Sequence, residues 1–198
     1  GTITIKCDPN TSTVARTGSI TIAGIGAASK TIAFTQAGLA PVLNVTPDSL
    51  VFQDTGGIQQ ISIESNMTWT LSESLTFVSL SATSGSNNRI IDVICQPNTS
   101  AIKRTGTITL SGTGVSPKTI RISQNAAAPS LSVSPKELAY DQSGGNKTLS
   151  ISSNTSWSVI ESLSYVSVSQ TTGTNNASIT LTCQPNSATV SRSGIVKI

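Results

Sequence analysis

Residues 65–80 read SNMTWTLSESLTFVSL, and the same pattern returns at residues 153–168 as SNTSWSVIESLSYVSV. The two stretches lie 88 residues apart, and this offset aligns the rest of the chain without an insertion or a deletion. The aligned pairs include Pro47 with Pro135, Trp69 with Trp157, Cys95 with Cys183, and Gly106 with Gly194. The first 40 residues keep the same register, since Cys7 aligns with Cys95 and Gly18 with Gly106. Repetition at one fixed period predicts an array of like modules.

This register divides the chain into residues 1–40, the back end of one repeat, residues 41–128, a complete repeat, and residues 129–198, the front part of the next. Because both ends fall inside a repeat, we expect the sequence to be a window on a longer chain. The alternative is an exchange of strands by which two chains complete each other. It is disfavoured because residues 1–22 and 177–198 are the same segment of the repeat, which a joined pair would carry twice.

Short apolar alternations, separated by turn residues every eight to twelve positions, fill the complete repeat. This spacing is typical of an antiparallel sandwich. Period-two spacing directs one apolar set inward and leaves mostly Ser, Thr and Asn outside. The inward set includes Ile61, Ile63, Trp69, Ile91 and Val93. The predicted fold class is all-β, with tandem immunoglobulin-like antiparallel β-sandwich repeats of 88 residues. The predicted strands are residues 43–46, 50–53, 59–64, 68–71, 78–81, 90–95, 106–110 and 118–123, and residues 84–88 are predicted to be a turn.

The motifs also carry a family resemblance. Residues 131–194 contain, in order, L-x-V-S-P, G-G, S-N-x-x-W, V-S-V, a turn with Gly and Asn, and R-x-G. The same elements recur in residues 43–110, with Thr46 and Leu80 in place of one Ser and one Val, and residues 1–40 keep the closing half, ARTGSITI followed by KTIAFTQAG. The pattern resembles the BACON domain, a Bacteroidetes-associated module. The resemblance implies an immunoglobulin-like fold, a place outside the cell or on the surface of a Gram-negative bacterium, and a role in carbohydrate or mucin binding or as a spacer.

Composition disfavours several functions. The chain has 12 Lys and Arg against 9 Asp and Glu, and the basic residues are scattered without interleaved aromatics, so nucleic-acid binding is not expected. No stretch reaches the roughly 18 apolar residues of a membrane-spanning helix. The absence of His leaves Ser and Cys nucleophiles without their usual base, so we expect no enzymatic activity and no cofactor. Glu73 and Glu161 recur between repeats and have Arg104 and Arg192 as candidate partners, but solvated loop positions are expected for both.

Three cysteines, one per repeat, exclude a disulfide within a module. Cys7, Cys95 and Cys183 each end an alternating apolar stretch, so we expect buried thiols that pack as small apolar side chains, with an inter-chain disulfide as the alternative. A metal site is not expected, because no His or second Cys is near any of them.

Two functions from different classes follow. In the first, the modules are non-catalytic structural repeats of a long bacterial cell-surface adhesin stalk or extracellular filament. Their partners would be neighbouring repeats, together with lateral or head-to-tail copies. The linkers at residues 37–42 and 125–130 are equal in length and carry Pro41 and Pro129 at the same place, which predicts stiff junctions with one constant geometry.

In the second, each module binds carbohydrate, such as mucin glycans, as part of a surface or secreted protein. Sugar binding commonly uses an exposed aromatic side chain that stacks on the ring, beside polar groups. Phe77 and Tyr165 are the candidate glycan platform, because they alone among the aromatics have outward parity. The family often carries a Trp at this place. A single aromatic per module is a weak platform, so we favour the structural function.

Overall fold

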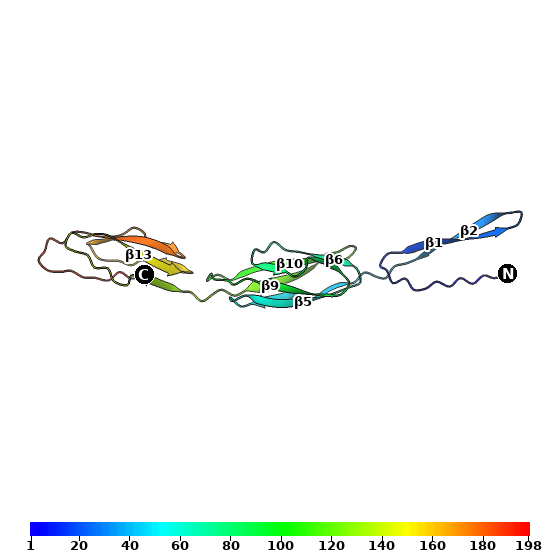
Figure 1. Cartoon of the computed structure of the whole chain (residues 1–198), viewed down its shortest axis with the longest axis horizontal. Coiled ribbons are helices and arrows are strands. Elements are labelled where there is room, and N and C mark those ends of the chain that lie inside the picture. Colours follow the sequence, from blue (N-terminus) through cyan, green and yellow to red (C-terminus); the bar gives the residue numbers. More distant parts are fainter. The chain divides into compact units, whose positions relative to one another are not determined.

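The computed structural model describes residues 1–198 and consists of strands, turns and loops without a helix (Figure 1). It therefore contains no helix that could cross a membrane. The chain divides into two compact units. The first contains Gly1–Phe52, Gly56–Gln96 and Thr105–Ser123, and the second contains Gln53–Thr55, Pro97–Arg104 and Gln124–Ile198.

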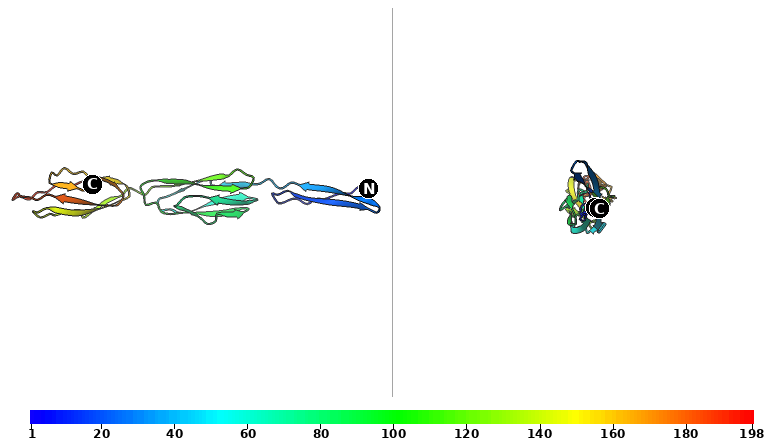
Figure 2. Two further views of the ribbon diagram at one scale, coloured as in Figure 1. Left: turned by 90° about the horizontal axis from the view of Figure 1, so that it is seen from above. Right: turned by 90° about the vertical axis from the view of Figure 1, so that its right-hand side faces the viewer.

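The complete repeat is a sandwich of two sheets, seen as two layers in Figure 2. From β3 to β10, each strand lies in the sheet opposite to that of the strand before it, so the chain crosses the core at every turn. This confirms the predicted all-β, immunoglobulin-like class. One sheet has the order β3 (Leu43–Thr46), β5 (Gly57–Ser65), β9 (Arg89–Cys95), β7 (Val78–Leu80). The other has the order β4 (Ser49–Phe52), β11 (Lys118–Gln124), β10 (Arg104–Gly112), β6 (Thr68–Ser72), β8 (Ser84–Ser86).

The predicted turn at residues 84–88 is wrong in part, because Ser84–Ser86 form β8 and pair with β6. Glycine at the centre of this strand explains the error, since Gly85 gives no apolar alternation. Its role is spatial, because a Cβ built on Gly85 would lie 2.5 Å from Cζ2 of Trp69. Only a residue without a side chain lets β8 lie across the indole.

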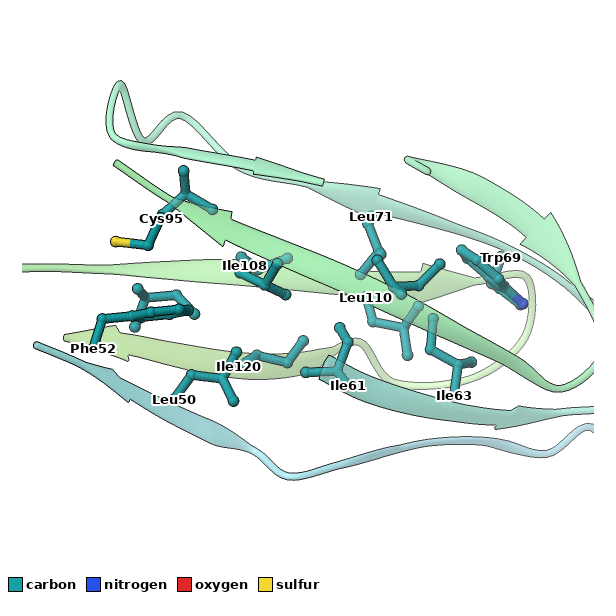
Figure 3. Packing of buried hydrophobic residues seen from close by; sticks show 14 of the residues in the cluster. Leu50, Phe52, Ile61, Ile63, Trp69, Leu71, Cys95, Ile108, Leu110 and Ile120 are labelled. Atoms are coloured by element: carbon teal, nitrogen blue, oxygen red, sulfur yellow. The ribbon is translucent and has the colours of Figure 1, made fainter. Parts of the chain in front are cut away.

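Most of the core of the complete repeat is formed by the inward set that period-two spacing predicts (Figure 3), and Phe77 joins it against that prediction. Trp69 is 2% exposed, which confirms its predicted burial, and its Nε1 donates a 2.9 Å hydrogen bond to the carbonyl of Asn87. Asn87 has a φ of 58°, a left-handed conformation that Asn tolerates better than most residues. The buried hydrophobic residues are Leu43, Leu50, Phe52, Ile61, Ile63, Trp69, Leu71, Phe77, Val78, Ile91, Val93, Cys95, Ile108, Leu110, Ile120 and Ile122.

The third repeat reproduces the first sheet and part of the second. Trp157 donates from Nε1 to the Asn175 carbonyl at 2.9 Å, and Asn175 has a φ of 59°, as Asn87 has in the complete repeat. Leu149, Ile151, Trp157, Val159, Ile179 and Leu181 form its buried core. One sheet has the order β12 (Leu131–Ser134), β13 (Gly145–Ser153), β17 (Ala177–Cys183), β15 (Val166–Val168), and the other pairs β14 (Ser156–Ser158) with β16 (Thr172–Thr174).

The second sheet of the third repeat is less complete. In the complete repeat β11 lies between β4 and β10, whereas here residues 136–141 form no strand and residues 192–198 contribute a single bridge, Ile160 with Lys197. A groove of about 1100 Å³ opens between them. Tyr140, Tyr165 and Arg192 are among its lining residues.

In residues 1–40 the ordered pairing is the hairpin of β1 (Arg16–Gly24) and β2 (Ala27–Gln36), whose side chains are mostly exposed. Residues 1–11 form no strand, and Ile3 and Ile5 are exposed. The predicted inward placement of this stretch is therefore wrong for this chain. Its counterpart β9 is held between β5 and β7, and residues 1–40 contain no equivalent of either strand.

Candidate functional site

The structure does not support the candidate glycan platform at Phe77. We expected an outward ring, but Phe77 is 7% exposed and belongs to the core. The parity argument fails because Phe77 lies in a turn before β7, in which the amide of Val78 donates to the carbonyl of Leu75. Strand alternation does not apply in a turn, so Phe77 and Val78 both point inward.

Tyr165, the corresponding candidate in the third repeat, is half-buried. The guanidinium of Arg192 lies 4.2 Å from the centroid of its ring, which is cation–π geometry and occupies that face of the ring. Its hydroxyl is buried without a hydrogen-bond partner. All seven aromatic side chains of the protein are buried or partly buried.

The polar residues that recur from repeat to repeat gather instead at the end of each module where the linker leaves. Arg104 donates from Nε to Oε1 of Gln124 at 2.7 Å and from Nη2 to the carbonyl of Pro97 at 3.1 Å. Gln124 is 0% exposed and donates from Nε2 to the carbonyls of Gln53, at 3.0 Å, and Asp54, at 3.3 Å. Because the polar atoms of its buried amide are paired, Gln124 fixes the loop that follows β4 to the start of β10.

The same arginine and glutamine pair in residues 1–40, where Arg16 Nε donates to Gln36 Oε1 at 2.7 Å. In the third repeat Arg192 donates to the carbonyls of Gln184 and Pro185, as Arg104 does to Pro97. The repeated arginine therefore stabilises the loop of its own module by hydrogen bonds.

A second recurring residue, Asn98, organises the loop itself. It is 4% exposed, and its Nδ2 donates to the carbonyls of Ile102 and Asn125, each at 2.9 Å. Asn10 makes the equivalent bonds to Val14, at 2.9 Å, and Ala37, at 3.1 Å. We predicted no role for these asparagines. Their recurrence at the 88-residue offset is the sequence signal that could have identified them.

Three ionisable groups make local contacts. Glu73, considered as a partner of Arg104, accepts a hydrogen bond from the amide of Leu75 and so closes a turn. The hydroxyl and the amide of Ser143 hold the pKa of the Asp141 carboxyl below its usual range. Burial, with a smaller effect of Cys183, raises the pKa of Tyr140, whose hydroxyl donates to the Leu181 carbonyl at 2.9 Å. No cluster of three or more His, Cys, Asp or Glu is placed to hold a metal ion.

The three cysteines are free thiols in three environments: Cys95 is buried, Cys183 is partly buried and Cys7 is exposed. The prediction of buried thiols is thus correct for Cys95 and wrong for Cys7, which lies in the unpaired stretch described above. The Cys7 thiol donates to Oε1 of Gln36 at 3.2 Å.

Alkylation of the 198-residue chain should therefore modify Cys7 rapidly and leave Cys95 untouched, because a thiolate must be accessible to react. Mass spectrometry after a short maleimide pulse measures both sites. In a Cys7→Ser variant, reducing and non-reducing gels should match. Labelling of Cys95 at the rate of Cys7, or a cross-linked ladder in that variant, contradicts the assignment.

Two family models match the chain. Residues 130–198 match the model described as "Viral BACON domain". Residues 1–37 and 68–125 match the BACON model described as "Putative binding domain, N-terminal". No curated protein matches the chain.

Solved structures of similar arrangement include a Bacteroides ovatus GH5 xyloglucanase in complex with a XXXG heptasaccharide, at 26% identity and a TM-score of 0.42 over 44% of this chain. The chain spans 19% of the xyloglucanase. The C. elegans MSP family member WR4 aligns at 15% identity and a TM-score of 0.32, over 43% of this chain and 97% of its own. The Yersinia pseudotuberculosis adhesin InvE aligns at 13% identity and a TM-score of 0.37, over 74% of this chain and 52% of its own.

The two family models together cover most of all three repeats, and they match the segments in which the 88-residue register, the paired Trp and Asn conformations and the sandwich sheets recur. The chain belongs to the BACON family and carries its domains in tandem.

Proposed function

We propose that the modules are non-catalytic structural repeats, serving as the spacer of a long cell-surface adhesin or extracellular filament. One observation carries the proposal: the polar residues that recur in each module hold its loops and linkers, whereas Phe52, Trp69, Phe77 and Trp157 are buried in the module cores. Such residues stabilise a tandem arrangement. Tandem modules that contact mainly their neighbours form quasi-one-dimensional arrays.

A place outside the cell, on the surface of a Gram-negative bacterium, fits this role and the bacterial module that the sequence resembles. The surface of a viral particle fits the same role, because residues 130–198 match a model described as viral. In both settings the modules would act as an extended spacer.

Glycan binding is the second candidate, because the family model matched by residues 1–37 and 68–125 is described as a binding domain. Tyr165 would be its contact residue, with Arg192 beside it. A sugar could stack on the face of Tyr165 that Arg192 covers only if the arginine side chain moved away from the ring, and otherwise Arg192 would have to contact the sugar as well.

A retention assay on immobilised mucin glycans separates the two. We expect the 198-residue chain to elute with the void, and a Tyr165→Ala variant to elute with it. Saturable retention that Tyr165→Ala abolishes contradicts the spacer function and favours the binding module. Small-angle scattering of a multi-module chain supplies the second arm: we expect a rod, and the profile of a compact flexible coil contradicts the proposal.

A further inference from the structure

The residue after strand β5, Asn66, and the residue after strand β13, Asn154, occupy the same place in two successive repeats. Each directs its side chain at the linker that enters its own module. Asn66 Nδ2 donates to the carbonyl of Ala40 at 2.9 Å, and its Oδ1 accepts from the amide of Val42 at 2.8 Å. Asn154 repeats both bonds, with the carbonyl of Ala128 at 2.9 Å and the amide of Ser130 at 2.8 Å.

These two bonds span the linker prolines. Pro41 and Pro129 have no N–H, so a strand cannot pair continuously through them. A side-chain amide carries a donor and an acceptor side by side and can pair with the carbonyl before the proline and the amide after it. The asparagine thus replaces a neighbouring strand at the one place where the backbone cannot supply it.

Within the second compact unit, Asn154 also reaches the loop Pro97–Arg104 of the preceding repeat. Its Nδ2 donates to the carbonyl of Thr99 at 3.2 Å, and its backbone carbonyl accepts from the amide of Ala101 at 3.3 Å. The linker joins the same loop, because the amide of Ala127 donates to the carbonyl of Ser100 at 2.9 Å. Leu39 and Ser12 make the equivalent bond at the first linker, at 2.8 Å.

The loop that receives Asn154 is itself held from inside. Asn98 pairs with Ile102 and Asn125 as described above, and its own amide donates to the carbonyl of Asp54 at 2.7 Å. The carbonyl of Thr99 and the amide of Ala101 are therefore presented from a preorganised turn, which lowers the ordering cost of contact with the next module.

We infer that Asn154 is a clasp residue: it binds the proline linker of its own module, and the surface around it fits the 97–101 loop of the preceding copy of the module. Asn66 holds its own linker by the same two bonds. The partner of this surface is thus another BACON repeat of the same chain. The use of the clasp, to keep successive modules in one orientation along a spacer, rests on the proposed function. The contact itself does not.

Amide hydrogen exchange of the 198-residue chain tests the clasp at single residues. In the unaltered chain we expect the amides of Ser130, Ala101 and Ala127 to be protected. Asn154→Ala removes the side-chain acceptor of Ser130 and should speed the exchange of that amide by about tenfold or more, the equivalent of one hydrogen bond. Ala101 keeps its acceptor, the backbone carbonyl of residue 154, but the loss of the side-chain bond to Thr99 loosens the 97–101 loop, so its exchange should also become faster.

Asn154→Asp separates the two contacts of the side chain. The aspartate keeps an acceptor for the amide of Ser130, which should stay protected, but it loses the donors to Thr99 and Ala128, so Ala101 should exchange as fast as in Asn154→Ala. Asn146→Ala is the matched control, because Asn146 is exposed on β13 of the same module and accepts only from the hydroxyl of Thr182, at 2.7 Å. It should leave all three amides unchanged.

Exchange of Leu149 and Ile151 in strand β13 reports whether the module stays folded in each variant. Unprotected Ala101 in the unaltered chain, or an Ala101 rate that neither Asn154 variant changes, overturns the clasp. Retention of the chain on glycans would overturn the spacer function and leave these exchange rates as they are, so the two failures are distinguishable.

Discussion

Replacement of Trp69 by alanine is expected to lower the free energy of unfolding of the complete repeat by about 3–5 kcal/mol. The indole is buried between the sheets, where its removal leaves a cavity beside Gly85. It also removes the donor to the Asn87 carbonyl, which holds the left-handed turn between β8 and β9. Of the single substitutions in this module, this one removes the largest fully buried side chain.

Urea denaturation followed by circular dichroism measures the effect. In this variant Trp157 is the remaining Trp, so its fluorescence reports separately on the unfolding of the third repeat. Ile58→Ala is the control: this isoleucine is exposed on β5, and its replacement should change stability by no more than about 0.5 kcal/mol. A loss below about 1 kcal/mol for Trp69→Ala would show that the indole does not anchor the core.

Gly85→Ala has the second largest expected effect, a loss of about 1–3 kcal/mol from overpacking. The added methyl group would meet Cζ2 of Trp69 at 2.5 Å and Cη2 at 2.9 Å, so either the indole or strand β8 must move. A Cβ built on Gly173 would clash with the ring of Trp157 in the same way, so Gly173→Ala should destabilise the third repeat likewise.

A double-mutant cycle identifies the cause. In a Trp69→Leu background the ring is absent, and Gly85→Ala should cost at least 1 kcal/mol less than in the unaltered chain, by the usual size of coupling between contacting residues. Ser84→Ala, at the exposed neighbouring position of β8, is the control and should be near neutral. Equal costs of Gly85→Ala in both backgrounds contradict a clash with the indole.

Sequence alone determined the period, the class and the core of this protein. A fixed 88-residue offset needs only aligned residues to be seen, and inward positions follow from alternation wherever a strand is regular. Ile61, Ile63, Ile91 and Val93 are buried for this reason, as predicted. The family could likewise be predicted, because its motifs consist of the Gly, Pro and Asn residues of turns and of the core tryptophan, which can be recognised in the sequence.

The orientation of Phe77, the strand at Gly85 and the exposure of Cys7 depend on tertiary contacts that no local pattern reveals. Alternation ends where a turn begins, so Phe77 turns inward beside Val78. A strand with glycine at its centre leaves no apolar trace, and Cys7 lacks the neighbouring strands that bury Cys95.

The loop and linker contacts were equally beyond prediction from local pattern. Gln124 pairs with Gln53 and Asn154 pairs with Thr99, at separations of 71 and 55 residues. A polar side chain in a loop has no periodicity to reveal its partner, because hydrogen bonds of this kind depend on which loops the packed sheets bring together. The core follows from the spacing of apolar residues along the chain, whereas the junctions follow from where the finished sandwich places its ends.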